Sequence, residues 1–146
     1  MIKPNAGATS DHFPCIAEAA GHEIVRFEDG EAYVAYMNFT SERARPEMLA
    51  MLEAQLKDAG LWEGFPKRQD FNTIEAYAEA LEAHAGIEPR SALRMSGEDI
   101  VFDPPRKSSG YAEFAERYSK LMMVVGYASV RDRQGFGFIG NEAVSR

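Results

Sequence analysis

An Asp-Gly pair early in the chain lies between two runs in which polar and apolar residues alternate. Asp29 and Gly30 tolerate the positive φ angles of a two-residue primed turn, which is the commonest connection in a β-hairpin. Pairing run 22–28 with run 31–39 gathers apolar side chains on one face of the hairpin, namely Val25, Phe27, Ala32, Val34 and Tyr36. We therefore predict a β-hairpin here with this face buried, which favours an antiparallel sheet.

Further segments have the apolar periodicity or the end signals of helices. They are residues 14–20, 46–59, 73–85 and 109–121. Pro46 is expected in the first turn of its helix, where the missing N–H leaves no hydrogen bond unmade. Asn72 is expected to cap the third segment through a capping box, and Ser108 or Ser109 to cap the fourth.

Strands are predicted in the second half of the chain as well. They are residues 99–102, 122–130 and 135–139. Pro104 ends the first of these because proline cannot donate to a sheet ladder. The polar residues 131–134 are expected to form the turn that joins the last two strands into a second hairpin. Residues 89–95 are predicted to form a short additional helix.

Taken in order, these elements predict an α+β fold and not a doubly wound parallel sheet. Strands joined mostly as hairpins, with helices between them, favour a mostly antiparallel sheet of about five strands with about three main helices packed on it. A length of 146 residues corresponds to one domain. We expect a loose N-terminal lead-in over residues 1–10 and a single α+β domain over residues 11–146.

The composition favours a soluble protein of the cytoplasm. The longest apolar stretch, residues 121–128, is far shorter than the ~20 residues that cross a bilayer. The first residues lack the apolar middle of a secretory signal. Cys15 is the only cysteine, so no intrachain disulfide can form and a reducing compartment fits. We therefore expect a cytoplasmic protein that does not bind membranes.

A glycine-rich segment near the C-terminus matches two nucleotide-related patterns. Residues 135–140 read G-x-G-x-x-G, but a dinucleotide site also needs a following helix and a later acidic residue. Residues 134–139 resemble the aromatic strand of RNA recognition motifs and cold-shock domains, which implies base stacking by Phe136 and Phe138. Gln134 stands where that pattern has a basic residue, and the net charge is −7. We therefore expect no nucleic-acid binding and two rings packed on the sheet.

Candidate metal ligands and nucleophiles are few and scattered. His12, Cys15 and His22 carry suitable donor atoms, but zinc takes several ligands that converge in space. Glutamates recur at helical spacing on one face of segment 73–85, at Glu75, Glu79 and Glu82. We expect that face to be solvated. The chain shows no assembled catalytic motif, so we predict no metal and no cofactor and leave enzymatic activity open.

Two aromatic residues and two arginines are our candidates for partner binding. Trp62 and Phe65 lie in a connection between two helices, where displayed rings beside basic residues make interface anchors. Arg131 and Arg133 lie at the predicted hairpin turn, a place where binding residues are common. With the acidic charge, they favour a small binding or regulatory protein that acts by protein–protein interaction. Such a protein would inhibit or neutralise a basic, nucleic-acid-handling partner by offering carboxylates in place of phosphates.

A second function stays open beside this one. Tyrosine combines an apolar ring with a polar tip and suits a small-molecule pocket between helices and sheet. The candidate lining consists of Tyr33, Tyr36, Tyr111, Tyr118 and Tyr127. A small-molecule ligand or an enzymatic activity would then depend on this pocket. The sequence also leaves a homodimer open.

Overall fold

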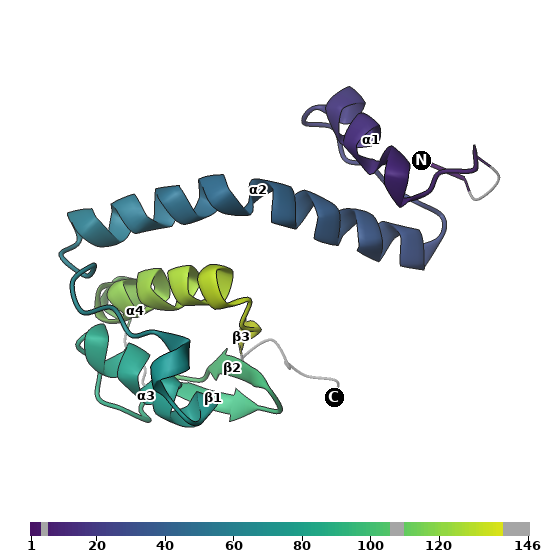
Figure 1. The fold of residues 1–146 in the computed structure, drawn as a ribbon. Coiled ribbons are helices and arrows are strands. Elements are labelled where there is room, and N and C mark those ends of the chain that lie inside the picture. The colour runs from purple at the N-terminus through teal and green to yellow at the C-terminus, as the bar shows by residue number, and fades with distance from the viewer. Residues whose placement is uncertain (4–5, 106–109, 139–146) are drawn as a thin grey trace. The chain divides into compact units, whose positions relative to one another are not determined.

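The computed structural model shows an α+β protein, as predicted, built from helices and a small sheet (Figure 1). The residues that it describes are 1–3, 6–105 and 110–138. The chain divides into two compact units, Met1–Glu47 and Met48–Arg146, and the boundary falls within helix α2 (Gly30–Asp58). The single domain over residues 11–146 stays a prediction. No helix in the described ranges combines the length and the apolar character that a membrane crossing requires.

Aromatic rings form the centre of the first unit. Helix α1 (Phe13–Ala20) confirms the predicted helix over residues 14–20. The ring centroid of Phe13 lies 5.4 Å from that of Tyr36 and 6.0 Å from that of Phe27. Phe13 and Tyr36 are both buried, at 4% and 5% exposure. Edge-to-face contacts of this kind stabilise a small core beyond the area that they bury.

The predicted hairpin around Asp29 and Gly30 is wrong, because Gly30 is the first residue of helix α2. The Asp29 carboxylate accepts a hydrogen bond from the Glu31 N–H at 2.9 Å, and its carbonyl accepts one from the Tyr33 N–H at 3.0 Å. Asp29 therefore starts a helix instead of a turn, a role that aspartate fills equally well. Tyr36 is buried and Ala32 and Phe39 are half-buried, which is a helical spacing, whereas Val34 of the predicted hairpin face is exposed.

Pro46 does not lie where the sequence predicts it. The sequence predicts a helix over residues 46–59 with Pro46 in its first turn. In the structure α2 is 29 residues long and Pro46 lies inside it. A proline there removes one hydrogen bond to the preceding turn, a cost that flanking helix on both sides has to offset. The predicted end of this helix, near Ala59, is confirmed to within one residue by the last residue of α2, Asp58.

The described part of the second unit contains a mixed sheet with three strands, in the order β1-β2-β3. The strands are β1 (Leu93–Ser96), β2 (Asp99–Phe102) and β3 (Phe136–Phe138). β1 pairs antiparallel with β2, whereas β2 pairs parallel with β3. The expectation of about five mostly antiparallel strands is therefore wrong. The predicted strand 99–102 is confirmed, and β3 confirms the described part of the strand predicted over residues 135–139.

Helix α4 (Tyr111–Asp132) replaces the predicted strand over residues 122–130. Its buried side chains recur with helical spacing, at Tyr118, Leu121, Val124, Val125, Tyr127 and Ala128. Burial of this face outweighs the strand propensity of the valines. The predicted turn at 131–134 is the end of this helix, where Arg133 adopts a left-handed conformation with φ 52°. The predicted caps Ser108 and Ser109 lie outside the described residues.

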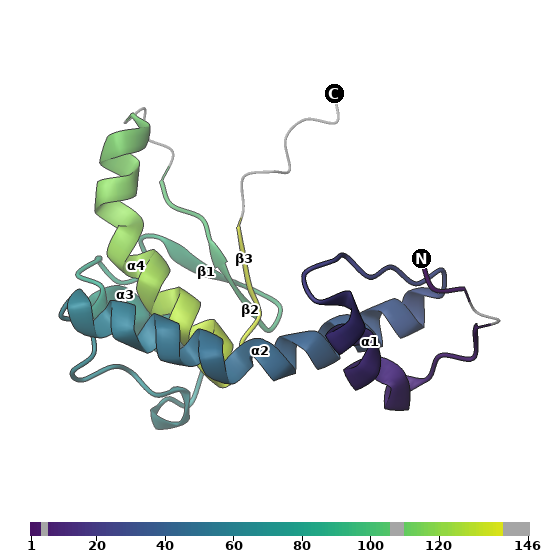
Figure 2. The ribbon, with the colours of Figure 1, turned by 90° about the horizontal axis from the view of Figure 1, so that it is seen from above.

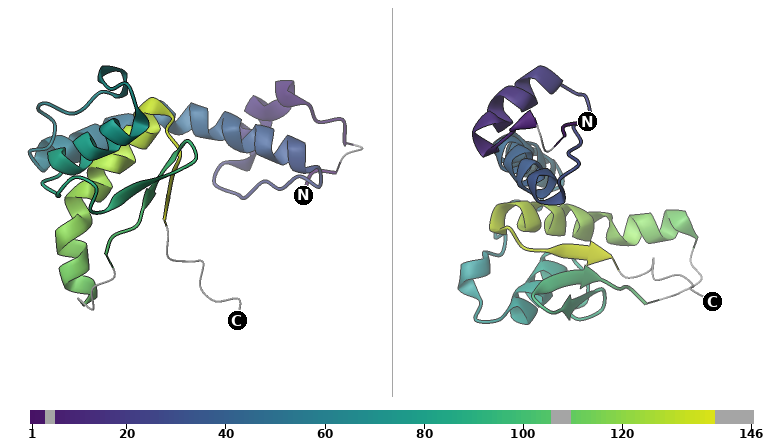
Figure 3. Two further views of the ribbon diagram at one scale, coloured as in Figure 1. Left: turned by 90° about the horizontal axis from the view of Figure 1, so that it is seen from below. Right: turned by 90° about the vertical axis from the view of Figure 1, so that its right-hand side faces the viewer.

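The core of the second unit lies between its helices and the sheet. Helix α3 (Ile74–His84) runs beside β1, and α4 crosses a face of the sheet (Figures 2 and 3). The most deeply buried apolar side chains, each less than 2% exposed, include Leu56, Tyr77, Leu81, Ile100, Leu121 and Val124. The cap of α3 is Thr73, whose hydroxyl accepts from the Ala76 N–H at 3.1 Å, and not the predicted Asn72. The short helix predicted at 89–95 is wrong, because β1 begins there.

Candidate functional site

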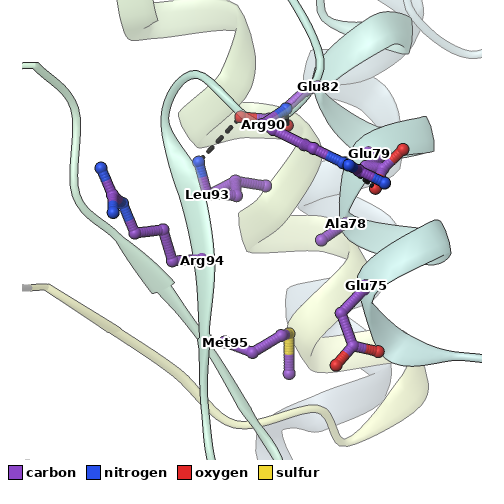
Figure 4. Close-up of a pocket in the computed structure, with 8 residues that line it drawn as sticks. All are labelled: Glu75, Ala78, Glu79, Glu82, Arg90, Leu93, Arg94 and Met95. Carbon is purple, nitrogen blue, oxygen red and sulfur yellow. Dashed lines mark hydrogen bonds and ion pairs between the residues drawn. The ribbon is translucent and has the colours of Figure 1, made fainter.

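A cavity of about 390 Å³ lies between α3 and β1 (Figure 4). Side chains from both elements and from the loop between them line it: Glu75, Ala78, Glu79, Glu82, Arg90, Leu93, Arg94 and Met95. The helical spacing of the three glutamates places them on one face of α3, which is the face that borders the cavity. The floor combines apolar groups with both signs of charge, which is the usual make-up of a binding pocket.

Glu82 fixes the geometry of this cavity. Its side chain is 0% exposed, so the predicted solvation of this glutamate is wrong. Its carboxylate accepts backbone hydrogen bonds from Ala92 at 2.7 Å, Leu93 at 2.8 Å and Arg90 at 2.5 Å. Arg90 has a φ of 63°, which turns the chain so that these N–H groups converge. The buried carboxylate thereby holds the start of β1 at a fixed distance from α3.

The charged groups around the cavity are paired, apart from one carboxylate. Arg90 forms an ion pair with Glu79 at 2.5 Å, and Arg94 forms one with Asp103 at 3.0 Å. For the exposed carboxylate of Glu75, the described ranges contain no hydrogen bond or ion pair. This carboxylate and the thioether of Met95 line the same cavity (Figure 4). The arrangement suits a cationic group that is carried on an apolar stem.

The structure brings three of the four predicted binding residues together around the ring of Tyr127. The ring centroids of Trp62 and Phe65 lie 5.5 Å and 5.1 Å from that of Tyr127. The guanidinium of Arg131 lies 5.0 Å above the Phe65 ring. Trp62 and Phe65 are partly buried and pack against the core. Arg133, which follows α4 as its C-cap residue, is exposed.

Arg131 ties the end of α4 to two other parts of the second unit. Its guanidinium donates to the Pro66 carbonyl at 2.8 Å, to the Tyr77 hydroxyl at 3.2 Å and to the Asp132 carboxylate at 2.9 Å. Its side chain is 23% exposed. Arg131 thus lies in a half-buried network and not on an exposed hairpin turn. The binding role of Trp62, Phe65, Arg131 and Arg133 stays a prediction.

The ionised carboxylate of Asp132 makes the free energy of unfolding depend on pH in the acid range. Burial acts to raise the pKa of this carboxyl, but hydrogen bonds from Arg131 and Tyr77 outweigh it and lower the pKa below its ordinary value. The ionised carboxylate contributes fully to the free energy of unfolding above its ordinary pKa of 3.8. This contribution is lost as the pH falls through the lower pKa that Asp132 has in the folded protein. We expect the free energy of unfolding, measured in urea, to fall with acidification in this range. The free energy of unfolding of Asp132→Asn should fall less on acidification than that of the parent chain. An equal fall in the two proteins would contradict this role of Asp132.

The predicted tyrosine pocket is only partly represented in the structure. Tyr111 and Tyr118 line a cavity of about 230 Å³ along α4. Tyr127 packs against Trp62 and Phe65 instead, and Tyr36 is buried in the first unit. A small-molecule role for these residues stays a prediction. Among the residues that the structure describes, no group of three or more His, Cys, Asp or Glu side chains is placed to hold a metal ion.

The cavity residues other than the glutamates gave no signal in the sequence. Arg90, Leu93 and Met95 belong to a loop and a strand that sequence reasoning assigned to a helix. Only the folded chain brings them opposite α3. The comparisons with known proteins add no assignment: no family model, no curated protein and no solved structure matches this chain.

Proposed function

We propose that this protein is a binding module that takes a basic side chain of a partner polypeptide into the cavity between α3 and β1. The observation that carries the proposal is the carboxylate of Glu75, which lacks a partner in the described residues and lines the same cavity as the apolar side chains of Met95 and Ala78. A lysine or arginine would lay its aliphatic stem on that surface and direct its charge to Glu75.

The overall charge supports the same kind of partner. The chain carries 23 acidic and 16 basic residues, a net charge of −7. Such a charge speeds the encounter with a basic surface and disfavours acidic partners. Proteins that handle nucleic acids present basic surfaces of this kind. By covering such a surface, the module would inhibit its partner, because carboxylates would then occupy the places of phosphates.

Binding of a simple basic peptide tests this function. An acetylated and amidated peptide of alternating lysine and valine should bind in calorimetry, and the same peptide with acetylated lysines should not. Glu75→Gln should weaken binding about fivefold, since exposed ion pairs contribute up to about 1 kcal/mol. Glu63→Gln is the matched control, because it removes the same charge from an exposed position away from the cavity. Equal losses in the two variants, or no binding by the parent chain, would overturn the proposal.

A further inference from the structure

β1 is the outer strand of the sheet within the described residues. In an antiparallel pair, the backbone groups of successive residues point alternately toward the partner strand and away from it. The Asp103 N–H donates to the Ala92 carbonyl at 2.8 Å, although the Ala92 N–H itself turns to Glu82. With this register the carbonyl of Ala92 and the backbone groups of Arg94 point toward β2. The backbone groups of Leu93 and Met95 therefore point to the outer edge, and both residues line the cavity.

Two further hydrogen bonds agree with this alternation. The Ile100 N–H, opposite Met95, donates to the Gly135 carbonyl at 3.0 Å and not to β1. The Leu93 N–H donates to Glu82 Oε1 at 2.8 Å, so a carboxylate occupies the place that a neighbouring strand's carbonyl would take. For the N–H and carbonyl of Met95, the described residues provide no such partner. The outer edge is thus closed at Leu93 and open at Met95.

We propose that an extended segment of the basic partner adds to β1 as a further strand, pairing its backbone with Met95 and directing a lysine or arginine to Glu75. This deepens the proposed function and rests on it. Successive side chains of a strand point to opposite faces, so alternate residues of the segment would face Glu75. Backbone hydrogen bonds give the affinity in such additions, and side-chain positions give the specificity.

Charge decides between a basic partner and a second copy of this chain. Pairing two copies through β1 would bring two molecules together that each carry −7. It would also place two carboxylate-bearing α3 faces at one interface. Like charges at an interface are unfavourable, whereas a segment rich in lysine or arginine complements Glu75. The occupant that the edge favours is therefore a basic extended segment.

Two N-methylated peptides test the strand addition. In a strand, the N–H groups of alternate residues point to opposite edges, so only one set can pair with β1. One version of the lysine–valine peptide carries N-methyl groups on its lysines and the other carries them on its valines. One version should bind about tenfold more weakly than the parent peptide, because its backbone hydrogen bonds to β1 are lost, and the other should keep its affinity. The Met95 amide should exchange its hydrogen more slowly when the parent peptide is bound.

The outcomes separate this inference from the proposed function. Binding that depends on Glu75, with both methylated peptides equally affected and no protection of the Met95 amide, would overturn strand addition and leave the proposed function standing. No binding of the parent peptide would overturn both. Protection of Met95 without peptide, rising with protein concentration, would indicate a second copy on this edge and would also overturn the inference.

Discussion

Replacing Glu82 by alanine should lower the free energy of unfolding of the second unit by about 3–5 kcal/mol. The carboxylate is fully buried and accepts the backbone N–H groups of Arg90, Ala92 and Leu93. Without it, these donors lose their acceptor, and those of Ala92 and Leu93 are buried. A buried donor without a partner costs about 1–3 kcal/mol. The loss would be measured as a lower midpoint of urea unfolding.

A second glutamate on the same helix provides the control. Glu79→Ala removes an ion pair with Arg90, whose side chain is 80% exposed, so the cost should stay below about 1 kcal/mol. If Glu82→Ala fails to fold, Glu82→Gln should give a measurable intermediate loss, because an amide oxygen can still accept from Ala92 and Leu93. Glu82→Ala and Glu79→Ala variants of equal stability would contradict the role given to Glu82.

Elements with local start and stop signals could be predicted from the sequence. Helix α1 follows from the proline at its start and Gly21 at its end. Helix α3 follows from its apolar stripe and the polar residues before it, although the cap is Thr73 and not Asn72. Strand β2 follows from a short apolar run that ends at prolines. In each case, neighbours in the sequence supply the decisive interactions.

The segments that were predicted wrongly are those in which local signals allow two structures. Asp29 can start a helix or begin a tight turn, and the packing of Tyr36 and Phe39 against Phe13 from one helical face favours the helix. The valine-rich end of α4 has strand propensity, but Leu121 and Val124 reach the core only from a helix. Tertiary packing decides such cases, and it cannot be read from one segment.

The candidate site shows the same limit. The sequence places Glu75, Glu79 and Glu82 on one helical face, and the structure agrees. The sequence gives no sign that Glu82 is buried, because the N–H groups that stabilise the carboxylate belong to a loop of irregular backbone conformation. Arg131 is a similar case, since its partner Pro66 lies 65 residues away in the sequence. Long-range contacts of both kinds turn residues that look solvated into structural ones.

Arg131 has the network of a residue that stabilises the fold. Its guanidinium stacks on Phe65 and donates to the Pro66 carbonyl, to Tyr77 and to Asp132. The hydroxyl of Tyr77 in turn donates to Asp132 at 2.5 Å, and Tyr77 is 0% exposed. Removing the cation would leave the half-buried carboxylate of Asp132 without its charge partner, which is the costly way to disrupt such a pair.

Arg131→Ala should therefore lower the free energy of unfolding by about 2–4 kcal/mol, as measured in urea at neutral pH. Lys120→Ala, at an exposed position of the same helix, should change it by less than about 0.5 kcal/mol. Arg131→Lys should recover only part of the loss, because an ammonium cannot reproduce the planar stacking and the several directed hydrogen bonds of a guanidinium. An Arg131→Ala variant as stable as the parent chain would show that this network does not stabilise the fold. The predicted role of Arg131 in binding a partner would then be the better explanation of the residue.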